Sequence, residues 1–370
     1  MGNEPGRKRL VNSVLPKDVA LFAALTLAYF IGARLGLKLA LVQPLATPIW
    51  LPAGGAIAAF IVFGYRVWPS VLVGSFLGHV TSLGLVSTSF VVPIGATLEG
   101  LVGAYLVDRF AHGVKAFETA RDVFLFAFFT CICAPSINAA VGIGIDYFGR
   151  HANLADSALI VLSWWVSHGI GALVIAPFLI LLFGSSHHRL NVRGFVELLT
   201  LLVGLVFVCL LVFGPLSVSL NKHHIVRAWS CVPFLIWAAF RFCPLEAAGT
   251  ALILFGTAIW GTLHGYGSFV SRNMTISLAV LDSFVGVIGT STLILAAMVV
   301  ERRRMEEELL GVQSLLLADV EGKRRALAES VQALNVEVAG HARTKKSLQD
   351  KEKQFRLLAA KTESRQGSSN

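Results

Sequence analysis

Charged residues are scarce in this chain. Asp, Glu, Lys and Arg together make up 14% of its 370 residues, whereas hydrophobic residues make up 55%. The mean hydropathy is +0.71, and apolar runs of about 20 residues recur, which is the length that crosses a bilayer. These values exclude a soluble globular domain and predict an all-α, polytopic membrane protein.

Signatures of metal, nucleotide and hydrolytic sites are missing as well. The five cysteines lie in or beside apolar runs, with the spacing of neither a disulfide framework nor a zinc site, so we expect buried thiols. No His-Glu-x-x-His, Gly-x-Ser-x-Gly or phosphate-binding loop occurs. The pairs His187-His188 and His223-His224 lie in loops, where metal binding is not expected. The sequence therefore predicts no cofactor, no metal and no catalytic residue.

Ten apolar segments follow one another along the chain. They cover residues 18–41, 48–64, 67–83, 88–110, 122–145, 157–183, 194–214, 228–240, 245–263 and 275–300. Several are short and only two or three residues apart, so we expect eight to ten spans with some tilted or re-entrant pairs. The first segment contains Arg34 and Lys38 and lacks a small-residue cleavage site, which favours a retained span over a signal peptide.

Lys and Arg are distributed unevenly between the connecting segments. With residues 1–17 inside, the inner segments carry Arg7, Lys8, Arg9, Lys17, Arg66, Arg109, Lys115, Arg121, Arg189, Arg193 and Arg241; the outer ones carry Arg150, Lys222, Arg227 and Arg272. This bias follows the positive-inside rule with an even number of spans and predicts that both termini lie in the cytoplasm. The net charge of +9 suits an anionic leaflet and requires no nucleic-acid partner.

Residues 301–362 have a different composition, rich in charge and free of proline. Apolar residues in this segment repeat with the 4-3 spacing of a coiled coil. The first run is Met305, Leu309, Val312 and Leu316, and the second begins at Leu327, Val331, Leu334 and Val338. Between them Leu316, Val320, Arg324 and Leu327 step 4-4-3, a stutter that locally unwinds the supercoil. The pattern predicts a homodimeric coiled coil; a solitary charged helix is the alternative, and residues 363–370 are expected to be disordered.

The junction at Val299, Val300 and Glu301 contains neither proline nor glycine. An apolar span that continues directly into a heptad segment suits the transfer of a movement across the bilayer. We therefore expect signal transmission through a set of residues on this segment: Glu301, Met305, Leu309, Val312, Leu316, Val320 and Leu327.

Ionisable residues inside the spans are candidates for function, because each costs ~2.5–3.5 kcal/mol to insert. The candidates, with the tryptophans expected at similar depth in the outer half, are Arg34, Trp50, His79, Glu99, Trp164, Trp165, His168, Trp260 and Asp282. One interpretation is an outward-facing pocket for a small polar ligand, with Glu99 and Asp282 set against Arg34 or His168. A second is proton sensing through His168. A third is interhelical packing, with an Arg34–Glu99 ion pair and a tryptophan belt.

Two further polar contacts are expected. Asn138 follows Pro135 and Ser136 in one span, so its side chain is expected to bond a backbone group that the proline leaves free. Arg241 and Glu246 flank Pro244 at a turn and are expected to form a surface pair.

Eight short motifs occur in order, from residue 29 to residue 265. They are YFIGARLG (29–36), TPIWLPAG (47–54), GYRVWP (64–69), TLE (97–99), WW (164–165), AP (176–177), WAAFRF (237–242) and WGTLHG (260–265). Together they resemble the bacterial membrane-associated sensor domain of type one (MASE), over residues 20–300. The family pattern has Asp three residues after the Trp-Trp pair, where this chain has His168.

The resemblance implies an N-terminal input module for a histidine kinase or a cyclic-di-GMP enzyme with GGDEF or EAL domains. Residues 352–358 resemble the helix that leads into a PAS domain, but the chain contains no kinase boxes, GGDEF or EAL motif. We therefore expect a non-enzymatic sensory domain that acts on a cytoplasmic output domain or kinase partner, in response to an unknown small ligand or the bilayer. The alternative is a transporter or channel for a small polar solute.

Overall fold

The computed structural model describes residues 16–42, 49–149, 154–184, 191–217 and 227–366, and helices are the only regular elements in these ranges. In order they are α1 (Pro16–Val42), α2 (Leu51–Phe63), η1 (Tyr65–Val67), α3 (Trp68–Leu83), α4 (Thr88–Phe110), η2 (Gly113–Lys115), α5 (Ala120–Phe128), η3 (Phe129–Cys133), α6 (Ala134–Gly149), α7 (Leu154–Gly184), α8 (Val192–Phe213), η4 (Ala228–Cys231), α10 (Val232–Arg241), α11 (Pro244–Leu263) and α12 (Met274–Gln366). The all-α prediction is confirmed, and each of the ten apolar segments is helical over most of its described residues.

Seven described helices are long and apolar enough to cross a membrane, and they make the chain a multi-pass membrane protein. Three elements are shorter: α2, α3 and the η4–α10 segment. Helix α2 has 13 residues and reaches only about 20 Å, short of the ~30 Å hydrocarbon core. The helix within the segment predicted at 48–64 is therefore shorter than a full span, and Pro52, Ala53 and Gly54 at its start are buried in the bundle.

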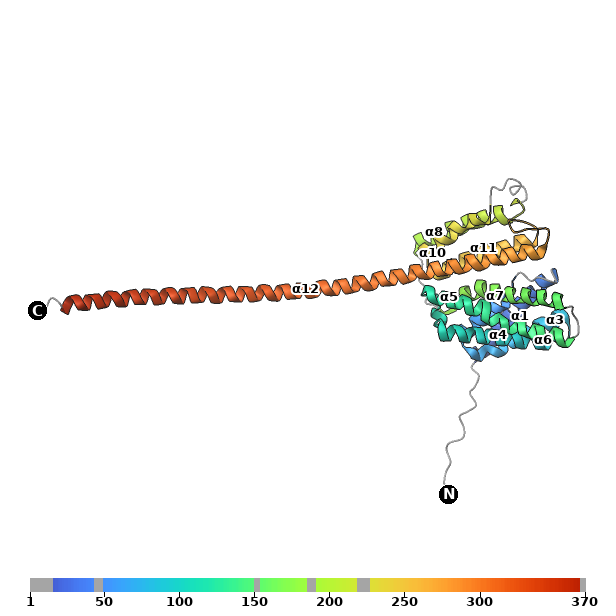
Figure 1. Ribbon diagram of the computed structural model, residues 1–370, viewed down its shortest axis with the longest axis horizontal. Helices are drawn as coiled ribbons and strands as arrows, with labels where there is room; N and C mark the ends of the chain where they lie inside the picture. Colours follow the sequence, from blue (N-terminus) through green and yellow to red (C-terminus); the bar gives the residue numbers. More distant parts are fainter. Residues whose placement is uncertain (1–15, 43–48, 150–153, 185–190, 218–226, 367–370) are drawn as a thin grey trace, which may run out of the picture. The chain divides into compact units, whose positions relative to one another are not determined.

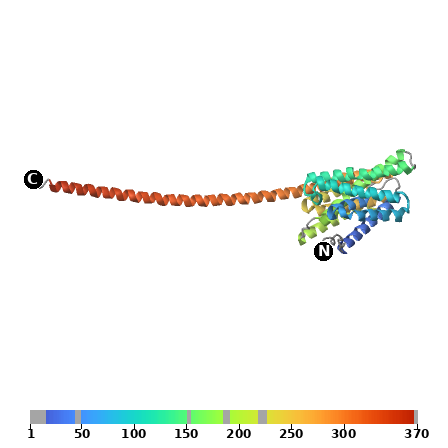
Figure 2. The same cartoon turned by 90° about the horizontal axis from the view of Figure 1, so that it is seen from below.

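The chain divides into two compact units, residues 1–302 and 303–370. In the first unit, α1, α2, α3, α4, α6 and α7 pack on one another (Figures 1 and 2), while α8, α10 and α11 form a smaller group that meets the larger one through α11 and α7. Leu293 and Ala297 of α12 join the buried cluster of the larger group, and Leu281 and Val285 join the cluster around α8 and α11. The apolar part of α12 thus packs on both groups.

Glycines allow α2 and α7 to touch at their backbones. A Cβ atom on Gly171 of α7 would lie 2.1 Å from the carbonyl oxygen of Trp50, and one on Gly54 of α2 would lie 2.4 Å from the carbonyl oxygen of Gly171. The amide of Trp50 also donates to the carbonyl of Ser167, at 2.9 Å. This close approach fixes the start of α2 against the middle of α7.

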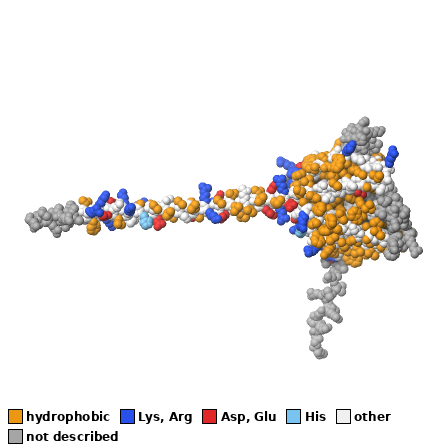
Figure 3. Space-filling view, viewed as in Figure 1, with side chains coloured by type: hydrophobic (Ala, Val, Ile, Leu, Met, Phe, Trp, Pro, Cys, Tyr) orange, Lys and Arg blue, Asp and Glu red, His pale blue; other side chains and the backbone are white. Residues whose placement is uncertain are grey.

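The second unit consists of the charged part of α12. Helix α12 runs without a break from Met274 to Gln366, through the predicted stutter, and residues 302–357 are all exposed. Residues 363–366, expected to be disordered, are helical, in a stretch without proline or glycine that runs from residue 341 to residue 366. The remaining predicted tail and the N-terminal residues 1–15 lie outside the described residues. Figure 3 shows the contrast in surface: mostly hydrophobic on the bundle, mixed with charge on the helix.

Candidate functional site

A buried polar centre lies near the middle of α4 and α7. The Nδ1–H of His168 donates to Oε2 of Glu99 at 2.7 Å, and the side chains are 9% and 2% exposed. The other oxygen of Glu99, Oε1, is buried with no hydrogen-bond partner in the described structure. A carboxylate–imidazole contact that is shielded from bulk solvent in this way is stronger than the same contact at a surface, because the local dielectric is low.

Asn138 of α6 completes this centre, and the prediction for its side chain is wrong. Its Nδ2 lies 3.3 Å from Nε2 of His168. In the same turn, the backbone carbonyl of Ile132 accepts from the hydroxyl of Ser136, at 2.7 Å, and from the indole of Trp165, at 3.3 Å. The side chain of Asn138 faces α7. In this geometry one ring nitrogen of His168 faces Glu99 and the other faces the amide of Asn138, so both ring nitrogens have a polar neighbour.

Gly95 explains how Asn138 fits between α4 and α6. A Cβ atom on Gly95 would lie 2.6 Å from Oδ1 of Asn138, so only glycine leaves room for the amide at this place. Gly95 is one helical turn before Glu99 on α4, which brings the carboxylate and the amide to the same side of that helix. In the sequence, an amide side chain within an apolar run could have indicated that Asn138 contacts another buried polar residue. The expectation of a bond to the backbone near Pro135 led away from that interpretation.

Aromatic rings cover the polar centre. The indole of Trp50 stacks on the imidazole of His168, with ring centroids 5.6 Å apart and an interplanar angle of 12°. On α1, Gly36 makes room for this indole, because a Cβ atom there would lie 2.8 Å from it. His79 of α3 approaches Trp50 at 6.2 Å between ring centroids, and its Nδ1–H donates to the carbonyl of Ser75. Four predicted site residues, Trp50, His79, Glu99 and His168, therefore come together.

Arg34 does not belong to this group. Its guanidinium donates to the carbonyl of Thr81 at 2.6 Å and to the hydroxyl of Ser82 at 3.0 Å, on α3. The Arg34–Glu99 ion pair considered from the sequence is wrong, because the carboxylate meets His168 while Arg34 reaches the end of α3. Arg34 joins α1 to the last turn of α3.

The other predicted residues occupy separate places. Trp164 packs against Gly142 of α6, where a glycine Cβ would be 3.2 Å from its ring. Trp260 of α11 is 46% exposed and lies 4.7 Å from the ring of His264. Asp282 of α12 is buried, and its Oδ1 has no partner in the described structure. The nine predicted residues do not line a single pocket.

Ion pairs and hydrogen bonds at helix ends join neighbouring helices. Arg66 in η1 lies 3.6 Å from Asp18 of α1, and the Tyr65 hydroxyl donates to Asp108 of α4. Burial, together with the hydrogen bond to Asp108, raises the pKa of Tyr65.

The expected Arg241–Glu246 pair is wrong. The Nε–H of Arg241 donates to both carboxylate oxygens of Glu197, each at 2.8 Å, and Oε2 of Glu246 is buried without a partner in the described structure. Arg241 ends α10 and Glu197 is in the second turn of α8, so the packing of those helices brings the two together. This pair connects α8 and α10 within the smaller helical group.

Two cavities between the described helices have linings that include neither Glu99 nor His168. One, of about 510 Å³, lies between α1, α2 and α7 and includes Tyr29 in its lining. The other, of about 340 Å³, lies between α5, η3, α7 and α12. Among the described residues, no three His, Cys, Asp or Glu side chains gather as a metal site would require; the two histidine pairs lie outside those residues.

These features define an integral membrane protein of the helical, multi-pass class. Within that class the MASE1 family model matches residues 21–303. The chain therefore belongs to the MASE1 family of membrane-associated sensor domains. No curated protein and no solved structure matches it.

Proposed function

We propose that the chain transmits a membrane or external signal through α12 to a cytoplasmic output, a histidine kinase or a cyclic-di-GMP enzyme. The observation that carries the proposal is the continuity of α12, in which the last apolar span and the heptad segment form one helix. A continuous helix passes on rotation or translation with little loss, because its backbone hydrogen bonds resist bending between turns. The positive-inside bias supports an orientation in which both termini lie on the cytoplasmic side of the inner membrane.

The heptad segment acts as a parallel homodimer in this proposal. Its seam residues are strongly exposed in a single chain: Leu309 by 68%, Leu327 by 65% and Val338 by 59%. Leucines and valines repeated at the a and d positions gain stability by packing against the same positions of a second helix. The stutter from Leu316 to Leu327 is the element with two packings of similar energy, which a movement of the last span would bias.

The polar centre has a positioning part in this mechanism. Glu99, His168 and Asn138 hold α4, α6 and α7 to one another through directional contacts. A stimulus that breaks the Glu99–His168 contact or turns the imidazole would change the packing of α7, which shares a buried cluster with Val285 of α12. The residues Glu301, Met305, Leu309, Val312, Leu316, Val320 and Leu327 carry that change onward.

Cysteine crosslinking in native membranes tests the dimer and the seam. Val338→Cys is on the seam and Val336→Cys is on the opposite face of the same turn, and both residues are exposed in one chain. With the exposed Cys243 replaced by Ser in both variants, Val338→Cys should form a disulfide-linked dimer rapidly and Val336→Cys slowly or not at all. Equal crosslinking at both positions would show that α12 does not pair along the predicted seam and would contradict the proposal.

A transporter is the second candidate, favoured by the short α2, whose start lies within the bundle beside the buried Glu99–His168 pair. Broken helices that end near mid-membrane line substrate sites in transporters. Solute uptake into proteoliposomes that is abolished by Glu99→Gln would establish this activity. Absence of uptake for a panel of small ions and amino acids, together with seam-specific crosslinking, would leave the sensory function.

A further inference from the structure

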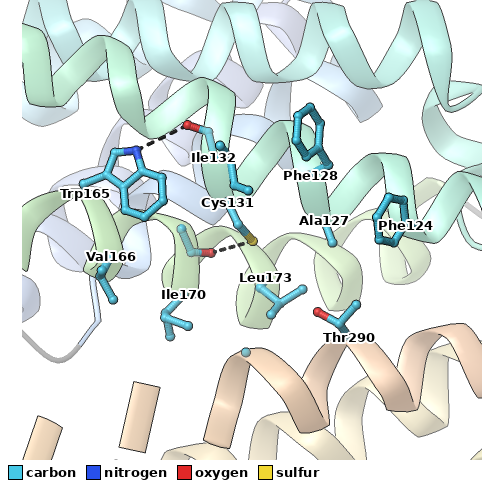
Figure 4. A pocket seen from close by; sticks show the side chains of 12 residues that line it. Phe124, Ala127, Phe128, Cys131, Ile132, Trp165, Val166, Ile170, Leu173 and Thr290 are labelled. Carbon is cyan, nitrogen blue, oxygen red and sulfur yellow. Dashed lines mark hydrogen bonds between the residues drawn. The ribbon is translucent and has the colours of Figure 1, made fainter. Parts of the chain in front are cut away.

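The cavity between α5, η3, α7 and α12 has features that the proposed function does not use. Its volume is about 340 Å³, at the lower end of the range of ligand sites. Figure 4 shows its side chains converging from three directions, with Phe124 and Phe128 from α5, Leu173 from α7 and Thr290 from α12. The cavity therefore borders the helix that continues into the heptad segment.

A π-helical turn forms one wall. In η3 the amide of Ala134 bonds the carbonyl of Phe129, five residues earlier, and Pro135 next to it has no amide hydrogen to give. Such turns widen a helix and expose backbone, and they are frequent at functional sites. The thiol of Cys131 donates to the carbonyl of Gly169 at 3.4 Å, and a Cβ atom on Gly169 would lie 2.8 Å from the carbonyl oxygen of Cys131. The wall is thus held tightly to α7.

The wall made by α12 is loosely packed by comparison. A Cβ atom on Gly286 would meet only Cδ1 of Ile170, at 3.8 Å, so this glycine leaves space that its neighbours do not fill. Thr290 is one turn further along α12, half-buried, and its side chain reaches toward the cavity in Figure 4. Unfilled apolar space beside a helix lowers the cost of moving that helix, because few contacts are lost.

The chemistry of the lining selects the occupant. None of the twelve lining residues is charged, and almost all present carbon atoms. Three of them on the α5–η3 side are exposed to the surroundings, Phe124 by 60%, Phe128 by 42% and Ile132 by 44%, on a segment apolar enough to span the membrane. The opening therefore faces the lipid bilayer, whose interior consists of acyl chains. A charged head group would find no partner inside, since carboxylate and ammonium partners are absent from the lining.

We propose that this cavity takes one acyl chain of a bilayer phospholipid, which wedges between α5–η3–α7 and α12. The chain enters from the membrane past Phe128 and Ile132, while its head group stays outside. Its length and degree of unsaturation then set how far α12 stands from α7, at the level of Gly286 and Thr290. The sensory consequence rests on the proposed function; the binding itself does not.

Photochemical labelling tests the binding. The full chain is placed in phosphatidylcholine vesicles that contain phosphatidylcholine with a diazirine on its acyl chain, irradiated and digested. Label should appear on the peptides that carry Leu173 and Thr290, which lie deeper than the exposed lipid-facing surface. The peptide that carries Phe207 of α8, 61% exposed, reports ordinary contact with surrounding lipid.

Filling the cavity provides the decisive variants. Gly286→Leu on α12 and Ala127→Phe on α5 each occupy the space from a different wall, and each should lower labelling of the Leu173 and Thr290 peptides several-fold. Labelling of the Phe207 peptide should not change. Gly256→Leu on α11 is the matched control, because Gly256 is exposed and has no atom within 4 Å of a built Cβ. Unchanged cavity labelling in both filled variants, with normal thermal unfolding, would overturn the proposal.

Two further outcomes separate the possibilities. If oleic acid removes the cavity label while the Phe207 label persists, the occupant is a free fatty acid and the assignment to phospholipid is wrong. A second outcome concerns signalling. If the acyl chain binds in the cavity, but Val338→Cys crosslinks equally in vesicles of short-chain and long-chain lipids, the lipid site stands and its link to the sensory function is overturned.

Discussion

Glycine has opposite roles in the two units of this protein. In residues 1–302, Gly54, Gly95 and Gly171 lie where a side chain would strike a neighbouring helix. In the second unit, Gly311, Gly322 and Gly340 have no atom within 4 Å of a built Cβ. The first set permits close packing, whereas the second only weakens an exposed helix, by ~1 kcal/mol per residue relative to alanine. Contacts between helices therefore define the structure of residues 1–302, whereas the glycines of the second unit make no such contacts within the chain.

Charge follows the same division. The Glu99–His168 pair is buried and joins residues far apart in the sequence. On the heptad segment the pairs Asp319–Lys323, Glu321–Arg325 and Glu352–Arg356 are local, one helical turn apart, and largely exposed. A buried pair is costly to break because one group is left without a partner, while exposed pairs contribute little. The bundle therefore fixes one geometry, and the heptad segment leaves register and partner to be chosen.

Removal of the imidazole should have the largest effect. In His168→Ala, Glu99 loses the one hydrogen-bond partner that it has among the described residues and stays buried, so the free energy of unfolding should fall by about 3–5 kcal/mol. Thermal unfolding in detergent, followed by the loss of folded monomer, measures this change. The variant His264→Ala, an exposed histidine on the loop after α11, should change stability far less.

A double variant distinguishes the buried charge from simple loss of packing. Glu99→Gln in the His168→Ala background replaces the stranded carboxylate with a neutral amide, so part of the lost stability should return. If Glu99→Gln lowers the stability of His168→Ala by as much as it lowers that of the unchanged protein, the two residues do not act as a pair. The contrast between a buried pair in the bundle and exposed pairs on the heptad segment would then fail.

The glycine at the α2–α7 contact comes next. Gly171→Ala places a methyl group against the carbonyl of Trp50, and overpacking of this kind costs about 1–3 kcal/mol. Because the start of α2 would move, the stacking of Trp50 on His168 should change, and with it the near-ultraviolet circular dichroism of the protein. Gly256→Ala, with open space around it, should be neutral or slightly stabilising. If Gly171→Ala and Gly256→Ala had the same stability, the close contact at Gly171 would not be important for the packing of the bundle.

The apolar runs of the sequence predicted the membrane helices well, because the length and the hydropathy of a span depend only on the residues within it. The limits of the ten segments, and the continuity across Glu301, required only composition and the absence of proline and glycine. Partners in the polar centre could not be predicted in the same way. Whether Arg34 or His168 meets Glu99 depends on the rotation of three helices, and those rotations are set by Gly36, Gly95 and Gly171, whose contacts a sequence does not display.

Loss of a local ion pair on α12 should have the smallest effect. Glu352→Gln removes a 2.8 Å contact with Arg356 between side chains that are 62% and 80% exposed, so the helix should lose only about 0.2–0.5 kcal/mol. Amide hydrogen exchange over residues 349–357 measures this, and the expected change in exchange rate is about twofold or less. A much larger change would mean that Glu352 has a partner outside its own chain. Since Glu352 continues the 4-3 spacing of the second heptad run, that partner would be a seam residue of a second copy, and this part of α12 would share the contact-defined character of the bundle.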